Sequence, residues 1–212
     1  FDKFLERHIK GAQFFDIDVV ADQETPLPHM LPTPEYFAAC VSSMGISNKD
    51  HIVIYDQSGL YMASARAWWM FRTFGHENVY VLEGGMLAWV HGGFGTESGP
   101  VDGPPEGNFK ARFRSDLVVS KNDLINNIET NATKVLDARP APRFEGKAPE
   151  PRSGMRAGHI PKSQNLPFSS LLDPQSRHVA GAEHIEEVLQ SLHLKREDKI
   201  AVSCGSGVTA CT

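Results

Sequence analysis

The sequence has little cysteine, no long apolar run and no excess of positive charge. Its three cysteines, Cys40, Cys204 and Cys211, form neither a disulfide framework nor a metal-ligand pattern, which favours a reducing compartment. No stretch reaches the roughly 18 consecutive apolar residues of a membrane-spanning helix. The net charge of −5 gives no electrostatic footprint for nucleic acid. We therefore expect a protein of the cytoplasm or the mitochondrion that binds neither nucleic acid nor a membrane.

One cysteine ends an apolar run and is followed by a glycine-rich segment. Residues 200–202 are predicted to form a short buried strand, and the glycines after Cys204 allow the chain to curl around the thiol. Backbone N–H groups in such a loop favour thiolate over thiol. Cys204 is either a nucleophile or a small buried thiol, and the flanking glycines favour the nucleophile. Cys40 and Cys211 are expected to be packed structural thiols, with Cys211 a redox partner if it faces Cys204.

Two pairs of segments recur at nearly the same distance along the chain. The segment around Asp56 aligns with the segment around Cys204, 148 residues later. A second aligned pair begins at His8 and His159, 151 residues apart, and these two histidines are expected to be structural. Two offsets that nearly agree predict a duplicated domain. Because only the second copy has a thiol at this position, we expect the first copy to act as a scaffold and as one wall of the site.

Strands and helices alternate along the chain, which predicts an α/β fold with a parallel sheet flanked by helices in each copy. Helices are predicted at residues 33–45, 63–74 and after the capping residue Ser120, and strands at residues 52–55, 79–82, 134–136 and 200–202. Residues 92–115 begin with a stretch rich in glycine and proline and are predicted to link a first domain, 1–91, to a second, 116–212.

The second copy is expected to be truncated. In the first copy, a helix, a strand and a further turn are predicted over residues 65–89, beyond the segment that aligns with Cys204. The second copy reaches only Thr212, and the first copy begins almost at Phe1. We therefore expect the natural protein to extend beyond both ends of this sequence.

Several motifs identify a family. In the second half, CGSGVTA occupies residues 204–210, RFEG residues 143–146 and PEPR residues 149–152. With FFDID at 14–18, PHMLP at 28–32 and WWMFR at 68–72, these motifs resemble the two-domain rhodanese family, and specifically its 3-mercaptopyruvate sulfurtransferase branch. The resemblance runs from His8 to the last residue. It implies tandem rhodanese-like domains, of which the second is catalytic and, here, incomplete.

The loop after the cysteine decides the branch. Rhodaneses that use thiosulfate carry an Arg-Lys pair there, whereas this chain has Gly205 and Ser206. A cationic loop suits the thiosulfate dianion, and a neutral loop suits a substrate whose single carboxylate is held elsewhere. The resemblance places Arg143 and Arg152 at that carboxylate. Taken alone, two arginines in a segment rich in proline and glycine are typical of exposed surface charges.

Other residues complete the implied substrate site. The resemblance adds Gly207, Val208 and Thr209 to the substrate-binding loop, together with Gly205. Arg139, just after a predicted strand, could be a structural ion-pair residue. We expect the loop of Arg143 and Arg152 to be exposed.

The resemblance also implies a mechanism. Asp18 and His29 match the family's proposed relay with Ser206, in which a histidine oriented by a carboxylate moves a proton. Cys204 would take sulfur from 3-mercaptopyruvate as a persulfide, release pyruvate, and pass the sulfur to a thiol such as that of thioredoxin, or to cyanide. No metal and no organic cofactor is implied, since the persulfide itself carries the sulfur.

Three other functions are considered. A thiosulfate:cyanide sulfurtransferase would share the fold and the cysteine. A non-catalytic rhodanese-like binding module would share the fold, but such modules usually lose the cysteine that this chain keeps. A phosphatase with this fold would need an arginine six residues after the cysteine, and Ala210 stands there.

Overall fold

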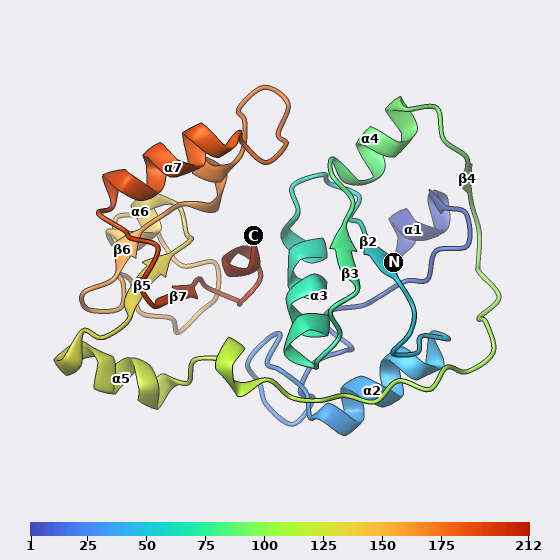
Figure 1. Cartoon of the computed structure of the whole chain (residues 1–212), viewed down its shortest axis with the longest axis horizontal. Helices are drawn as coiled ribbons and strands as arrows, with labels where there is room; N and C mark the ends of the chain where they lie inside the picture. Colours follow the sequence, from blue (N-terminus) through green and yellow to red (C-terminus); the bar gives the residue numbers. More distant parts are fainter. The chain divides into compact units, whose positions relative to one another are not determined.

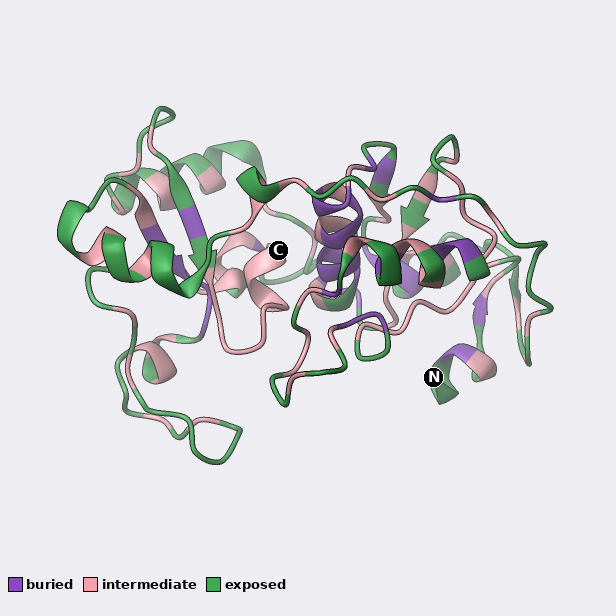
Figure 2. Ribbon diagram, turned by 90° about the horizontal axis from the view of Figure 1, so that it is seen from below, coloured by how far each residue is buried: buried purple, intermediate pink, exposed green.

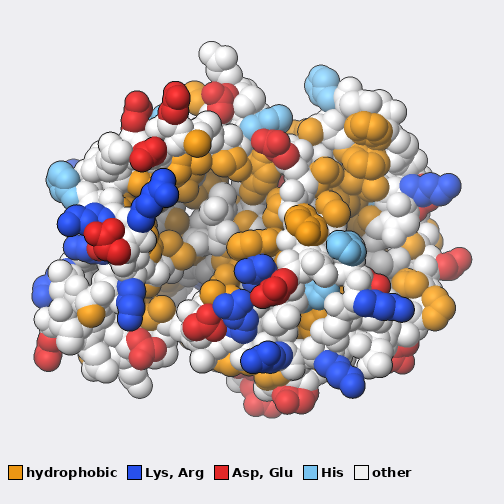
Figure 3. Space-filling view, viewed as in Figure 1, with side chains coloured by type: hydrophobic (Ala, Val, Ile, Leu, Met, Phe, Trp, Pro, Cys, Tyr) orange, Lys and Arg blue, Asp and Glu red, His pale blue; other side chains and the backbone are white.

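The computed structural model describes residues 1 to 212 and divides them into two compact units (Figure 1). Unit 1 is Phe1–Val118 and unit 2 is Val119–Thr212, and each is an α/β unit with parallel strands and flanking helices. No helix is at once long enough and apolar enough to cross a membrane. Lysine and arginine side chains are interspersed with aspartate and glutamate on the face drawn in Figure 3.

Unit 1 carries one parallel and one antiparallel strand pair. Strands β2 and β3 pair in parallel, with Ile52 opposite Val79, and β1 pairs with β4 in the antiparallel sense. The elements of unit 1 are α1 (Asp2–Glu6), β1 (His8–Ile9), α2 (Pro34–Ser43), β2 (Ile52–Ile54), α3 (Met62–Thr73), β3 (Val79–Val81), α4 (Gly85–His91), β4 (Thr96–Glu97) and the short 3₁₀ helix η1 (Ser115–Leu117).

The predicted helix start at Thr33 is confirmed. The Thr33 hydroxyl accepts a hydrogen bond from the Tyr36 amide at 3.2 Å, and Pro34 takes the first helical position, where no amide donor is needed. Aromatic rings from α2, α3 and the chain beyond them pack together in the core, mostly edge to face, and the buried residues concentrate on α3 (Figure 2). The core cluster contains Val20, Phe37, Val41, Met70, Phe71, Phe74, Val79 and Phe109.

Residues 92–115, the predicted linker, belong to unit 1. Strand β4 in this stretch pairs with β1, and the Phe109 ring is only 4% exposed within the core cluster. The Arg112 amide donates to the carbonyl of Phe74 at 2.9 Å, and the Lys110 amide donates to the Asn48 side chain at 2.7 Å. The buried Phe109 ring and the hydrogen bonds of its neighbouring backbone amides therefore hold this stretch to the rest of unit 1. The domain bounds 1–91 and 116–212 stay a prediction.

Unit 2 is built on a three-stranded parallel sheet with the order β6-β5-β7. Helix α5 begins with a capping box, because the Ser120 hydroxyl accepts from the Asp123 amide while the Asp123 carboxylate accepts from the Ser120 amide. The elements of unit 2 are α5 (Lys121–Thr130), β5 (Lys134–Asp137), α6 (Ala141–Phe144), β6 (Gln164–Asn165), η2 (Phe168–Leu171), α7 (Ala182–Ser191), β7 (Ile200–Ser203) and η3 (Thr209–Cys211).

The strand ends of unit 2 meet at one edge of its sheet. Asp137, the last residue of β5, lies opposite Ser203 of β7 on one side and opposite Asn165 of β6 on the other. Because the three strands run parallel, the residues that follow them emerge at the same edge, where ligands bind in open α/β sheets. Cys204 and Arg139 are placed at this edge.

The structure repeats the contacts of the two aligned histidines. Nδ1 of His8 lies 2.7 Å from the Phe4 carbonyl oxygen, and the two rings stack with centroids 4.2 Å apart. Nδ1 of His159 lies 2.8 Å from the Phe144 carbonyl oxygen, and its ring stacks on Phe144 at 3.9 Å. Each histidine thus contacts both the backbone carbonyl and the ring of one phenylalanine. The predicted structural role of both histidines is supported by these contacts.

Candidate active site

The loop after β7 surrounds the Cys204 sulfur with hydrogen-bond donors. The Gly207 amide donates to Sγ at 3.1 Å, and Gly207 has φ of +68°, a conformation that favours glycine. Burial of the half-buried thiol acts to raise the pKa of Cys204. The Thr209 hydroxyl and the backbone amides of Ser206, Ala210 and Gly207 outweigh burial and hold that pKa below its ordinary value. The arrangement therefore favours the thiolate, which is the nucleophilic form.

The first copy builds the same loop around a carboxylate. Asp56 Oδ1 accepts from the Gly59 amide at 2.8 Å, and Gly59 has φ of +67°, close to that of Gly207. The Ser58 amide and the Ser64 hydroxyl also donate to the Asp56 carboxylate, at 3.0 Å each. A carboxyl group thus occupies the place that the thiol takes in the second copy. This supports the expectation that the first copy lacks thiol chemistry at this position.

The Thr209 hydroxyl is testable on its own. Replacing Thr209 with valine keeps the side-chain shape and removes a donor to sulfur, so we expect the pKa of Cys204 to rise. The Cys204 thiol is mainly in its thiolate form only at pH values above its pKa. The acidic limb of the rate of persulfide formation should therefore move to higher pH, with a lower rate near neutral pH. Thr130→Val, in helix α5, is the matched control, and an unshifted profile in Thr209→Val would contradict the role of this hydroxyl.

Both arginines implied by the resemblance reach Gly205. Nη1 of Arg152 donates to the Gly205 carbonyl at 3.3 Å from an exposed position. Nη2 of Arg143 lies so close that a Cβ atom at Gly205 would be 2.7 Å from it. Gly205 is therefore the point where the cysteine loop and the two arginines meet. The absence of a side chain at Gly205 leaves the space in which the Arg143 guanidinium lies.

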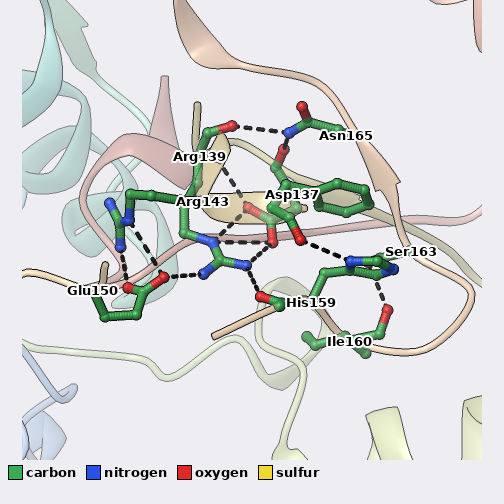
Figure 4. A network of polar contacts seen from close by, with 10 residues as sticks. Asp137, Arg139, Arg143, Glu150, His159, Ile160, Ser163 and Asn165 are labelled. Carbon is green, nitrogen blue, oxygen red and sulfur yellow. Dashed lines mark hydrogen bonds and ion pairs between the residues drawn. The ribbon is translucent and has the colours of Figure 1, made fainter. Parts of the chain in front are cut away.

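Arg143 is half-buried, contrary to the expectation that this whole loop is exposed. Its side chain is 24% exposed, because Nη2 forms an ion pair with the Glu150 carboxylate at 2.6 Å. Figure 4 shows Glu150 between the guanidinium groups of Arg143 and Arg139. Arg143 lowers the pKa of the Glu150 carboxyl, with Arg139 adding to the shift, so Glu150 is held as a carboxylate.

Arg139 is the structural ion-pair residue that its position after β5 allowed. Its guanidinium binds the Asp137 carboxylate through Nε and through Nη2, the latter at 2.6 Å, and these hydrogen bonds raise the pKa of Arg139. Nη1 donates to Glu150 at 2.8 Å. The sequence indicated no role for Asp137 or Glu150, the two acidic residues that pair with Arg139 and Arg143. It showed only an acidic residue directly after a predicted strand and another two residues before Arg152.

Asp18 and His29 are in contact in unit 1. Nε2 of His29 lies 2.8 Å from Asp18 Oδ1, with side chains that are 13% and 77% exposed respectively. The carbonyl of His29 also accepts a hydrogen bond from the buried Arg66 guanidinium, which ties down the histidine backbone. The Asp18 carboxylate can thus orient the imidazole of His29. Ser206 belongs to unit 2, and the relay with Ser206 stays a prediction.

The other two cysteines form no disulfide. Cys40 packs against the core cluster of unit 1. The Cys211 thiol donates to the carbonyl of Gly207 at 3.3 Å, and so contacts the residue whose amide binds Cys204. No cluster of three or more His, Cys, Asp or Glu side chains is placed to hold a metal ion.

A cavity of about 550 Å³ lies in unit 1, and no residue of the Cys204 loop is part of its wall. Its wall includes Phe14, Phe15 and β2, and Asp56 is among its polar residues. This wall is mainly apolar and contains no cysteine. The chemistry of the Cys204 loop, and not the size of this cavity, therefore identifies the candidate site.

Comparison with known proteins finds relatives along the whole chain. A model of the rhodanese-like domain matches residues 1–91 and 120–212. The 3-mercaptopyruvate sulfurtransferase of Escherichia coli strain K12 is 40% identical over 208 residues, which span 98% of this chain and 73% of that protein. The crystal structure of SseA from Escherichia coli, from a study of the rhodanese fold and catalytic mechanism of 3-mercaptopyruvate sulfotransferases, is similar with a TM-score of 0.88. It is 38% identical, and the match covers 99% of this chain and 77% of SseA.

A relative from the other branch is almost as similar. The thiosulfate sulfurtransferase of Gallus gallus is 39% identical over 211 residues, which span 99% of this chain and 71% of that protein. Overall sequence identity alone therefore does not distinguish the two branches of the family. The residues of the Cys204 loop distinguish them better. Gly205 and Ser206 are neutral, and the room beside Gly205 holds Arg143. On these findings together, the chain belongs to the two-domain rhodanese family, in its 3-mercaptopyruvate sulfurtransferase branch.

Proposed function

We propose that this chain is a sulfurtransferase that moves sulfane sulfur from 3-mercaptopyruvate to a thiol acceptor or to cyanide and releases pyruvate. The observation that carries the proposal is the Cys204 loop, in which donors lower the pKa of the thiol while Arg143 and Arg152 meet at the adjacent Gly205. A nucleophilic sulfur and a pair of cations for one carboxylate are the two things that this substrate requires.

The first half of the reaction forms a persulfide. The Cys204 thiolate attacks the sulfur of 3-mercaptopyruvate, a new sulfur–sulfur bond forms and the carbon–sulfur bond breaks. The bonding electron pair leaves on carbon as the enolate of pyruvate, which takes up a proton. The scheme needs no metal or organic cofactor, because Cys204 itself stores the transferred sulfur.

The second half regenerates the thiolate. An acceptor thiolate, such as that of a reduced thioredoxin, attacks the outer sulfur and leaves Cys204 as a thiolate again. A second thiol can then release the sulfur as hydrogen sulfide, and cyanide would take it as thiocyanate. A thiol acceptor requires a reducing compartment, so we place the protein in the cytoplasm or the mitochondrion.

The proton of the first half-reaction is assigned to Ser206, His29 and Asp18. The hydrogen bond between Asp18 and His29, 2.8 Å long, supports this assignment because it would fix the tautomer of the imidazole. Ser206 follows Cys204 by two residues, so its hydroxyl is tied to the nucleophile's own loop. This relay is tested by His29→Gln, which should lower kcat for pyruvate release from 3-mercaptopyruvate.

Arg152 should serve the substrate more than the fold. Arg152→Ala is expected to lower kcat/KM for 3-mercaptopyruvate by roughly 10- to 100-fold, which corresponds to about 1.5–3 kcal/mol for a hydrogen bond to a charged group. Its melting temperature should hardly change, because Arg152 is exposed. Arg143→Ala should give a similar kinetic loss and also a lower melting temperature, because it leaves Glu150 without its shortest ion pair.

Lysine variants provide the control for charge alone. Arg143→Lys and Arg152→Lys should recover only part of the lost kcat/KM, since an ammonium group cannot reproduce the fork of a guanidinium. If neither alanine variant changes the kinetics with 3-mercaptopyruvate, other groups hold the carboxylate and the assignment of the arginines is wrong.

Initial-rate kinetics test the proposed function as a whole. With 3-mercaptopyruvate varied at several fixed concentrations of a thiol acceptor, we expect parallel double-reciprocal lines, since a persulfide intermediate separates two half-reactions. A second candidate, a thiosulfate sulfurtransferase, is favoured by the similarity to the thiosulfate sulfurtransferase of Gallus gallus and predicts a higher kcat/KM for thiosulfate than for 3-mercaptopyruvate. A non-catalytic module predicts no turnover of either donor.

A further inference from the structure

We propose that Glu150 is a positioning residue that holds Arg143 against the Cys204 loop and thereby favours a monocarboxylate donor over a dianion. The inference rests on the proposed function, because it concerns how that site selects its substrate. Nothing in the sequence motif gives Glu150 this task, since a glutamate between two prolines is usually a surface residue.

Glu150 is buried and uses both of its carboxylate oxygens. The side chain is only 2% exposed. Oε2 accepts from Nη2 of Arg143 at 2.6 Å, while Oε1 accepts from Nη1 of Arg139 at 2.8 Å and lies 3.4 Å from Nε of Arg143. A carboxylate held from two sides has little freedom to turn. Arg143 therefore has its Nε and Nη2 groups oriented by a partner that cannot follow it into solvent.

Arg139 acts as the support of this arrangement. Three hydrogen bonds at 2.6–3.1 Å join its Nε and Nη2 groups to the Asp137 carboxylate, and Nη2 also donates to the Gly158 carbonyl at 2.7 Å. The Asn165 side chain donates to the carbonyls of Asp137 and Arg139 and so joins the ends of two strands. Figure 4 shows this chain of contacts from the sheet edge to Arg143.

The orientation of Arg143 has a chemical consequence. Its hydrogen bonds to Glu150 use Nε and Nη2, which leaves Nη1 open to a substrate oxygen, while Nη2 borders Gly205 of the cysteine loop. The four charged groups Asp137, Arg139, Glu150 and Arg143 sum to zero, so the network adds no net positive charge for a dianion. Glu150 thus orients the guanidinium of Arg143 for one substrate carboxylate. Its negative charge also offsets one positive charge of the site, which disfavours a dianionic donor.

Glu150→Gln tests the proposal by donor choice. The amide keeps the size of the side chain, loses the negative charge and turns one acceptor into a donor facing an arginine. We expect KM for 3-mercaptopyruvate to rise about tenfold with little change in kcat, because the carboxylate contact is the same in the ground and transition states. The kcat/KM for thiosulfate should be unchanged or higher, since the site gains net positive charge. The ratio of the two kcat/KM values should therefore fall at least about tenfold.

Glu145→Gln is the matched control. Glu145 lies in the same loop and pairs with Lys147 at 2.8 Å, but that ion pair is exposed. This control should leave both donors unchanged. Glu150→Asp keeps the charge on a shorter side chain and should shift the ratio less than Glu150→Gln does. In an Arg143→Ala background, Glu150→Gln should have no further effect on KM for 3-mercaptopyruvate, because Glu150 positions the partner of that carboxylate only through Arg143.

The outcomes separate this proposal from the proposed function. If the wild-type protein does not turn over 3-mercaptopyruvate, the proposed function fails. If it does, and Arg143→Ala changes the donor ratio while Glu150→Gln leaves it unchanged, the role of Glu150 is overturned. If Glu150→Gln does not fold, as judged by its melting curve, Glu150→Asp decides: an intermediate shift of the ratio supports the proposal, and an unchanged ratio overturns it.

Discussion

Replacing Cys204 with serine is expected to abolish sulfur transfer and to leave the fold intact. A serine hydroxyl stays neutral near neutral pH and cannot store sulfane sulfur, whereas donors in the loop lower the pKa of the Cys204 thiol. The serine oxygen can still accept the hydrogen bond that the Gly207 amide donates to sulfur. Pyruvate release from 3-mercaptopyruvate should fall by on the order of 10⁴-fold or more, the scale expected when a nucleophile is removed. The melting temperature should stay close to that of the wild type.

Cys40→Ser provides the matched control for this substitution. Cys40 also forms no disulfide, and it packs beside the core of unit 1. Its replacement should leave the rate of pyruvate release unchanged at a small cost in stability. Turnover that survives in Cys204→Ser would remove Cys204 from the reaction.

The second large effect is a change of donor. Gly205→Arg combined with Ser206→Lys should shift preference from 3-mercaptopyruvate toward thiosulfate. A side chain at Gly205 must displace the Arg143 guanidinium, because a Cβ there would lie 2.7 Å from Nη2. The two added cations suit a dianion, while the carboxylate loses an oriented partner. We expect the ratio of kcat/KM for the two donors to move by at least about 100-fold, as measured by pyruvate and thiocyanate formation.

Gly205→Ala separates the steric part of this effect from the electrostatic part. A methyl group displaces Arg143 but adds no charge, so kcat/KM for 3-mercaptopyruvate should fall without a gain for thiosulfate. A wild-type protein that already prefers thiosulfate would place the chain in the other branch of the family. A double variant that loses both donors equally would mean that the loop supports the fold and does not select the substrate.

Local signals predicted much of the fold because they act within a few residues. The caps at Thr33 and Ser120 form hydrogen bonds to amides three residues ahead, and both helices begin where the sequence indicates. The repeat aligned Asp56 with Cys204 in the sequence, and in the structure each of the two residues is followed by the same glycine turn. Beyond the Cys204 loop the chain forms only the short η3, Thr209–Cys211.

Residues whose role depends on distant partners were not predictable. Composition described 92–115 as a linker, but nothing local shows that the Phe109 ring enters a core built by residues far earlier in the chain. The burial of Glu150 likewise follows from Arg139 and Arg143, which a loop without periodicity brings around it. The half-buried state of Arg143 has the same origin.

The most direct test is the mass of the peptide that contains Cys204. After the purified protein is incubated with 3-mercaptopyruvate without an acceptor, this peptide should gain the mass of one sulfur atom, its fragment ions should place the gain on Cys204 and not on Cys211, and a reducing thiol should remove it. The peptide that contains Cys40 should show no such change. If pyruvate is released and the sulfur is found elsewhere, or if Cys204 stays unmodified while turnover proceeds, the central claim that sulfur passes through a Cys204 persulfide is contradicted.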